Sequence, residues 1–124
     1  HPTSHHRDDP ALYEKVTKIN EFHTSLFAYY LDKLDATPDG NGSLLDNMLM
    51  LYGAGMSDSN RHQNTGLPLV LLGGGSGTVK GGRHLRYAEG TPISNLHLTM
   101  LERMGIPMDR MSNSTGHLDL LSDV

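Results

Sequence analysis

The chain has 124 residues, no cysteine and a net charge of −4, from 10 basic and 14 acidic side chains. This length predicts one domain or a piece of a larger one. The absence of cysteine excludes disulfides, iron–sulfur clusters and thiol catalysis, and the lack of a Lys/Arg cluster argues against a nucleic-acid partner. No apolar run approaches the roughly 20 residues that span a bilayer, so we expect no membrane span. Because the chain begins at His1 and not at methionine, we expect either a removed leader or a fragment boundary.

Residues 1–9 are expected to form an irregular arm that leads into one long amphipathic helix. Asp8 or Asp9 is a candidate N-cap, and Pro10 suits the first helical position. Residues 37–42 hold a proline and two glycines, which predict a turn after the helix. Between these signals, apolar residues recur every three or four positions, which is the helical period. They are Leu12, Val16, Ile19, Phe22, Leu26, Tyr30 and Leu34.

Two apolar runs, 44–52 and 67–72, predict strands that are covered on both faces. The glycine-rich stretch 73–82 predicts a loop, since it matches neither the P-loop nor the dinucleotide-binding pattern. A second helix is expected over 93–104, followed by an irregular tail over 107–124. This order favours one α/β domain over 1–124, with a small parallel or mixed sheet flanked by helices.

Two strands alone bury their faces poorly. Their edges must therefore be covered by another strand, by another chain or by the rest of a larger domain. We accordingly expect a homo-oligomer, because self-association follows from the few strands and needs no catalytic site.

Polar residues gather just past the predicted strands, where sites form in open α/β sheets. Asp58 and His62 would share one face if this segment opened into a helix, with Ser57 and Asn60 beside them. Asp58, His62 and His84 are candidate ligands for a divalent metal such as zinc, iron or manganese. Arg61 and Arg83 are candidate clamps for an anionic substrate. The alternative interpretation is that Ser57 or Asp58 caps a turn and that His62 is a solvated loop residue.

Eight histidines are the compositional outlier of this chain. His1 with His5 or His6 predicts a copper site, and the alternative is a plain polar arm. His23 and His97 lie on the predicted helices, where a partly buried, hydrogen-bonded role is expected. No G-x-S-x-G pattern is present, so a serine triad has little support.

Three segments resemble sulfatases and alkaline-phosphatase-like enzymes: 44–52 leading into Ser57 and Asp58, 67–74, and 92–101 with 105–107. The chain is most similar to the C-terminal portion of an uncharacterised family of exported bacterial proteins that is distantly related to this superfamily. Residues 57–62, 82–84 and 114–116 carry that similarity, which covers about 5–121. The superfamily's nucleophile half is absent here, and Ser59 stands where sulfatases place a histidine after the aspartate.

The resemblance implies a secreted or periplasmic, metal-dependent hydrolase of a phosphate, sulfate or carboxylic ester. Asp58 and His62 would then be catalytic. These two residues and His84 would hold a divalent metal, which we expect to be zinc, with iron, manganese or copper as alternatives. Ser57, Asn60, Arg61 and Arg83 would contact the small anionic or ester substrate. The alternative is a non-catalytic metal-binding or self-associating module that is a fragment of a larger domain.

Overall fold

The computed structural model describes residues 1–118, and its longest element is the helix α1, Pro10–Asp35. Asp9 caps this helix, because its Oδ1 accepts a hydrogen bond from the Ala11 N–H at 2.8 Å. Pro10 stands at the first turn, where its missing N–H costs no hydrogen bond. The predicted helix and its start signal are thus confirmed. No helix in this described part is long and apolar enough to cross a membrane.

The first strand begins later than predicted, because the first residues of the predicted strand form a short helix. After the small hairpin of β1, Pro38–Asp39, and β2, Gly42–Ser43, the chain forms α2, Leu44–Asn47. A capping box builds that helix: Ser43 Oγ accepts from the Asp46 N–H, and the Ser43 N–H donates to Asp46 Oδ2 at 2.8 Å. The strand β3 therefore covers only Met50–Gly53.

The strand β4, Leu69–Leu72, pairs antiparallel with β3, with Met50 opposite Leu72 and Gly53 opposite Leu69. The expected parallel or mixed sheet is not seen, since both two-stranded sheets within 1–118 are antiparallel. The connection explains the difference: residues 54–68, here called the 54–68 loop, double back without a helix. A parallel pair needs a crossover connection, usually helical. The fold is mixed α/β all the same.

The best-buried part of the chain is α3, Ile93–Arg103, which follows the short 3-10 helix η1, Gly75–Gly77. Leu98 is fully buried and Leu96 nearly so. The described part of the tail, residues 107–118, is irregular as predicted and is tied to α3 by side-chain hydrogen bonds: the Thr115 N–H donates to Asn95 Oδ1, and the Leu118 N–H donates to Thr99 Oγ1 at 2.7 Å. The sequence also predicts one apolar patch in this tail, at Leu118, Leu120 and Leu121, and the last two of these residues lie outside the described residues.

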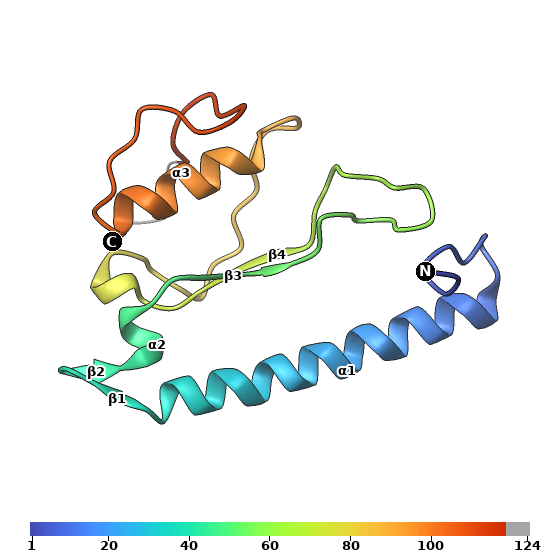
Figure 1. Cartoon of the computed structure of the whole chain (residues 1–124), viewed down its shortest axis with the longest axis horizontal. Coiled ribbons are helices and arrows are strands. Elements are labelled where there is room, and N and C mark those ends of the chain that lie inside the picture. The colour runs from blue at the N-terminus through green and yellow to red at the C-terminus, as the bar shows by residue number, and fades with distance from the viewer. Residues whose placement is uncertain (119–124) are drawn as a thin grey trace.

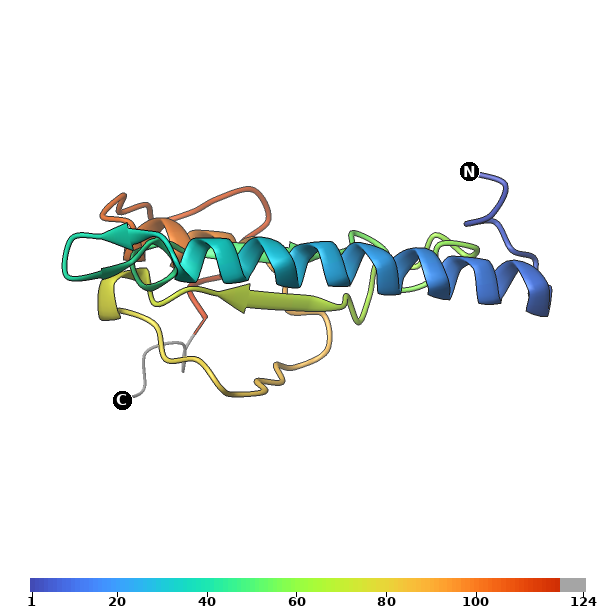
Figure 2. The same ribbon diagram turned by 90° about the horizontal axis from the view of Figure 1, so that it is seen from below.

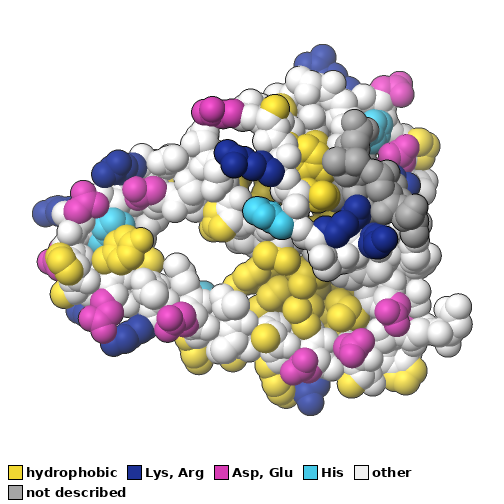
Figure 3. Space-filling view, turned by 180° about the vertical axis from the view of Figure 1, so that it is seen from behind, with side chains coloured by type: hydrophobic (Ala, Val, Ile, Leu, Met, Phe, Trp, Pro, Cys, Tyr) yellow, Lys and Arg dark blue, Asp and Glu magenta, His cyan; other side chains and the backbone are white. Residues whose placement is uncertain are grey.

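The elements form three loosely joined layers. Figure 1 shows α1 along one side, the β3–β4 hairpin in the middle and α3 with the tail on the other side. Seen from below, in Figure 2, α1 runs nearly the whole length of the molecule. Phe27 of α1 stacks on Tyr52 of β3, with ring centroids 3.8 Å apart, and this contact joins the first two layers. Towards the N-terminus, α1 and the hairpin diverge around an opening that Figure 3 shows.

The chain buries little of its surface. It exposes 8811 Å² of surface, whereas a folded monomer of 13.6 kDa exposes about 6,600 Å². Large apolar side chains of α1 account for part of this excess, and His23, which was expected to be partly buried, is exposed as well. The exposed apolar residues of α1 are Tyr13, Ile19, Phe22, Leu26, Tyr29 and Tyr30.

Candidate functional site

Residues 58–62 form a tight turn and not the helical start considered above. Asp58 Oδ1 accepts hydrogen bonds from the backbone N–H groups of Asn60 at 2.9 Å and Arg61 at 3.1 Å. Beyond the turn, the Gln63 N–H donates to the Asp58 carbonyl oxygen at 2.9 Å. The Asp58 carboxylate therefore shapes the loop, which is the turn-capping role of the alternative interpretation.

The neighbouring polar side chains also hold the loop together. Ser57 Oγ donates to the Thr65 carbonyl oxygen at 2.7 Å. Asn60 Oδ1 accepts from the Arg7 N–H at 3.0 Å, which brings the N-terminal arm against the loop. The Arg61 guanidinium is largely exposed, and its Nε lies 3.5 Å from Asp58 Oδ2. An exposed pair of this kind contributes little to stability.

His62 lies beside the N-terminal arm. Its backbone has a φ of +54°, a left-handed conformation that is uncommon outside glycine. Its ring centroid lies 4.8 Å from that of His5, and the ring centroid of His1 lies 4.3 Å from that of His5. His6, the other half of the histidine pair, is 5% exposed and its Nδ1 accepts from the Asp8 N–H. The arm is therefore ordered by specific contacts and is not a plain solvated segment.

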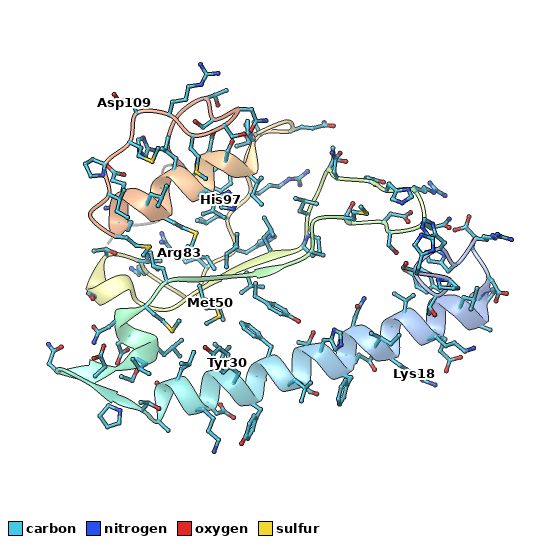
Figure 4. The ribbon with its side chains drawn as sticks, in the orientation of Figure 1. Lys18, Tyr30, Met50, Arg83, His97 and Asp109 are labelled. Carbon is cyan, nitrogen blue, oxygen red and sulfur yellow. The ribbon has the colours of Figure 1, made fainter. Side chains whose placement is uncertain are left out.

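The other two candidates, Arg83 and His84, lie elsewhere. Figure 4 shows Arg83 beneath α3, at the end of the hairpin away from the N-terminal arm. Its Nε and Nη2 donate to the Lys80 carbonyl oxygen at 3.1 and 3.0 Å, and His84 next to it is exposed. Within residues 1–118, no three His, Asp or Glu side chains form a group that could hold a metal ion. The structure thus brings Asp58 and His62 into one loop but does not gather His84 with them.

A solvent-open cavity of about 740 Å³ lies between the arm, the start of α1 and the 54–68 loop. Imidazole, guanidinium and amide groups dominate its polar lining, so it offers donors to an anion and nitrogens to a metal. Its lining residues are His1, Pro2, His5, His6, Arg7, Asp9, Leu12 and Asn60. Sequence reasoning treated the histidines of the arm and the 54–68 loop as separate features, because nothing local in the sequence links them.

Comparisons of the chain with models of protein families, with curated proteins and with solved structures found no match.

Proposed function

We propose that this chain is a non-catalytic, self-associating module, in which α1 packs against α1 of a second copy. The observation that supports this most strongly is the excess of exposed surface, which is about 2,200 Å² above that of a typical monomer of this mass. A standard interface buries about 800 Å² on each partner, so the excess is large enough for a stable pair.

The pattern on α1 gives a reason for choosing a second copy as the partner. Spacings of alternately four and three residues place one seam along the helix, as in helices that pair lengthwise. Of these positions, Ile19, Leu26 and Tyr30 are 46–50% exposed. Around a two-fold axis, the seam of one copy packs against the same seam of the other copy. One surface on the chain therefore suffices to form a dimer. The seam comprises Leu12, Val16, Ile19, His23, Leu26 and Tyr30.

The mass of the whole chain in solution tests this proposal. Light scattering after size exclusion, at about 100 μM chain, should give twice the mass of 13.6 kDa. Leu26→Glu puts a charge at the centre of the seam and should give a monomer. Thr24→Glu adds the same charge away from the seam and should leave the mass doubled. A monomeric unsubstituted chain, or equal masses for the two variants, would overturn the proposal and point to a different covering surface, such as the rest of a larger domain.

A metal-dependent ester hydrolase is the second candidate, because Asn60, one of its predicted substrate contacts, lines the cavity described above. Asp58 and His62 would hold the metal with a third ligand, for which His84 is the sequence-based choice, and Arg61 would face an anionic ester. A metal-bound water would be the nucleophile, since a metal lowers the pKa of bound water toward neutrality. Arg83 would need to approach from the far end of the hairpin to contact the same substrate.

Turnover of chromogenic phosphate, sulfate and carboxylic esters, with zinc, manganese, iron or copper added, tests this second candidate. His62→Asn should abolish turnover while the far-UV circular dichroism stays unchanged. Asparagine is chosen because it tolerates the left-handed backbone of His62. Turnover that survives this substitution would exclude His62 from the reaction.

A further inference from the structure

His5 and His62 are far apart in the sequence but adjacent in the fold. Their ring centroids are 4.8 Å apart with the ring planes at 59°, and the ring centroid of His1 lies 4.3 Å from that of His5. One ring comes from the N-terminal arm and the other from the 54–68 loop. The His5–His62 pair therefore joins two irregular segments directly. Of these rings, His1 and His5 line the cavity described above.

Two hydrogen bonds flank the pair and fix how the arm lies on the loop. Ser59 Oγ donates to the Ser4 carbonyl oxygen at 2.9 Å. The Arg7 N–H donates to Asn60 Oδ1 at 3.0 Å. His5 lies between the two arm residues, and His62 closely follows the two loop residues. The adjacency of the rings is therefore set by the backbone and by small polar groups, and not only by ring contact.

We propose that His5 and His62 together bind a divalent transition metal, zinc foremost, which clips the N-terminal arm to the 54–68 loop. Two imidazoles on one tetrahedral zinc ion, with Zn–N distances of about 2.0–2.1 Å, have ring centroids about 5 Å apart. The spacing of 4.8 Å therefore fits shared ligation after the rings turn about χ2, which is a soft torsion. Water completes the coordination shell of the metal.

This ligand set differs from the one that the sequence suggests. With the side chains in their present rotamers, no three His, Asp or Glu residues within 1–118 form a group that could hold a metal ion. Metal binding therefore requires the imidazole rings of His5 and His62 to rotate. Both Asp58 oxygens already interact with the turn and with Arg61. His84 follows Arg83, which lies at the other end of the hairpin. His5 therefore replaces His84 as the partner of His62.

Calorimetric titration of the full chain with zinc chloride, together with the visible absorption of added cobalt(II), tests the clip. The unsubstituted chain should bind one metal per chain. His5→Ala and His62→Asn should each weaken binding by about tenfold or more, because each removes a ligand. His84→Ala is the matched control and should bind as the unsubstituted chain does. Equal affinity in all four proteins, or a loss confined to His84→Ala, would overturn the proposal.

A second readout follows the arm itself and stays informative if a variant folds poorly. Zinc should slow amide hydrogen exchange in residues 1–9 of the unsubstituted chain, because the clip suppresses local opening. It should leave that exchange unchanged in His62→Asn. The Leu26→Glu variant should keep both zinc binding and this protection, since the clip does not depend on self-association. Exchange that is insensitive to zinc in the unsubstituted chain would contradict an arm clipped by metal.

Discussion

The Asp46 carboxylate holds the first turn of α2 through its contacts with Ser43. The backbone N–H of Ser43 donates to Asp46 Oδ2 at 2.8 Å, and its hydroxyl donates to the same oxygen at 2.9 Å. These two hydrogen bonds, the backbone one first, hold the pKa of Asp46 below its usual value of 3.8. The ionised form is thus favoured in the folded state. Its contribution to stability is present above pH 3.8 and is lost as the pH falls through the lowered pKa.

We predict that Asp46→Asn flattens part of the acid dependence of stability. The difference in free energy of unfolding between the unsubstituted chain and this variant should shrink as the pH falls below 3.8. Urea denaturation at a series of pH values measures it. Ser43→Ala keeps the backbone N–H, so it should retain part of the acid dependence that Asp46→Asn removes. A difference that stays constant down to pH 2 would contradict a lowered pKa for Asp46.

At single residues, the sequence was informative where the signal is local. The caps at Asp9 and Asp58 act within three residues, and both could be predicted. The capping box of Ser43 and Asp46 carried an equally local signal, but the apolar run that follows outweighed it. The approach of His5 to His62 joins residues 57 positions apart, and no periodicity or cap encodes such a contact.

Among the elements, the turn after β4 depends on one glycine. Gly73 has a φ of +90°, and a Cβ added there would overlap the carbonyl oxygen of Met48. Next to it, the N–H groups of Gly74 and Gly75 donate to the carbonyl oxygens of Leu45 and Met48 at 3.1 and 3.0 Å. The chain therefore leaves β4 in close contact with α2, and only glycine allows that approach.

We predict that Gly73→Ala destabilises the fold by at least about 3 kcal/mol, because it combines backbone strain with a steric overlap. Gly77→Ala is the matched control, since Gly77 has a similar φ of +85° but no atom within 4 Å of an added Cβ. Strain alone should cost this variant about 1 kcal/mol. Urea denaturation measures both values. Equal costs would show that the contact with Met48 has no energetic weight.

The elements themselves were largely predictable, whereas their pairing was not. The 3.6-residue period and the flanking signals predicted both α1 and α3, and the two apolar runs predicted β3 and β4, although the first run was predicted as a strand from residue 44 and β3 begins only at Met50. Strand direction depends on the connection, and the 54–68 loop gave no signal that distinguishes a hairpin from a crossover. The period also predicts a buried stripe on α3, and this prediction was partly wrong; the stripe comprises Ile93, Leu96, Met100, Leu101 and Met104. Met104 is 63% exposed, while Leu98, which lies outside that stripe, is fully buried.

For the whole molecule, the sequence indicated that two strands could not cover their own faces. Within 1–118, the β3–β4 pair is joined by no third strand, and α1 meets the hairpin through few contacts such as Phe27 on Tyr52. Three layers with little shared core leave much of the long helix, including several large apolar side chains, exposed. Burial of these apolar side chains against a second copy would add stability to the fold.

We therefore predict that the stability of the chain depends on its concentration. If copies pair through α1 and separate on unfolding, each tenfold rise in concentration should stabilise the pair by about 1.4 kcal/mol, by mass action. Urea denaturation at about 1, 10 and 100 μM should show the midpoint rising in step. Leu26→Glu should remove this dependence, because its chains unfold as monomers, while Thr24→Glu should keep it. A midpoint that does not move with concentration in the unsubstituted chain would mean that the exposed face of α1 is not covered by a second copy.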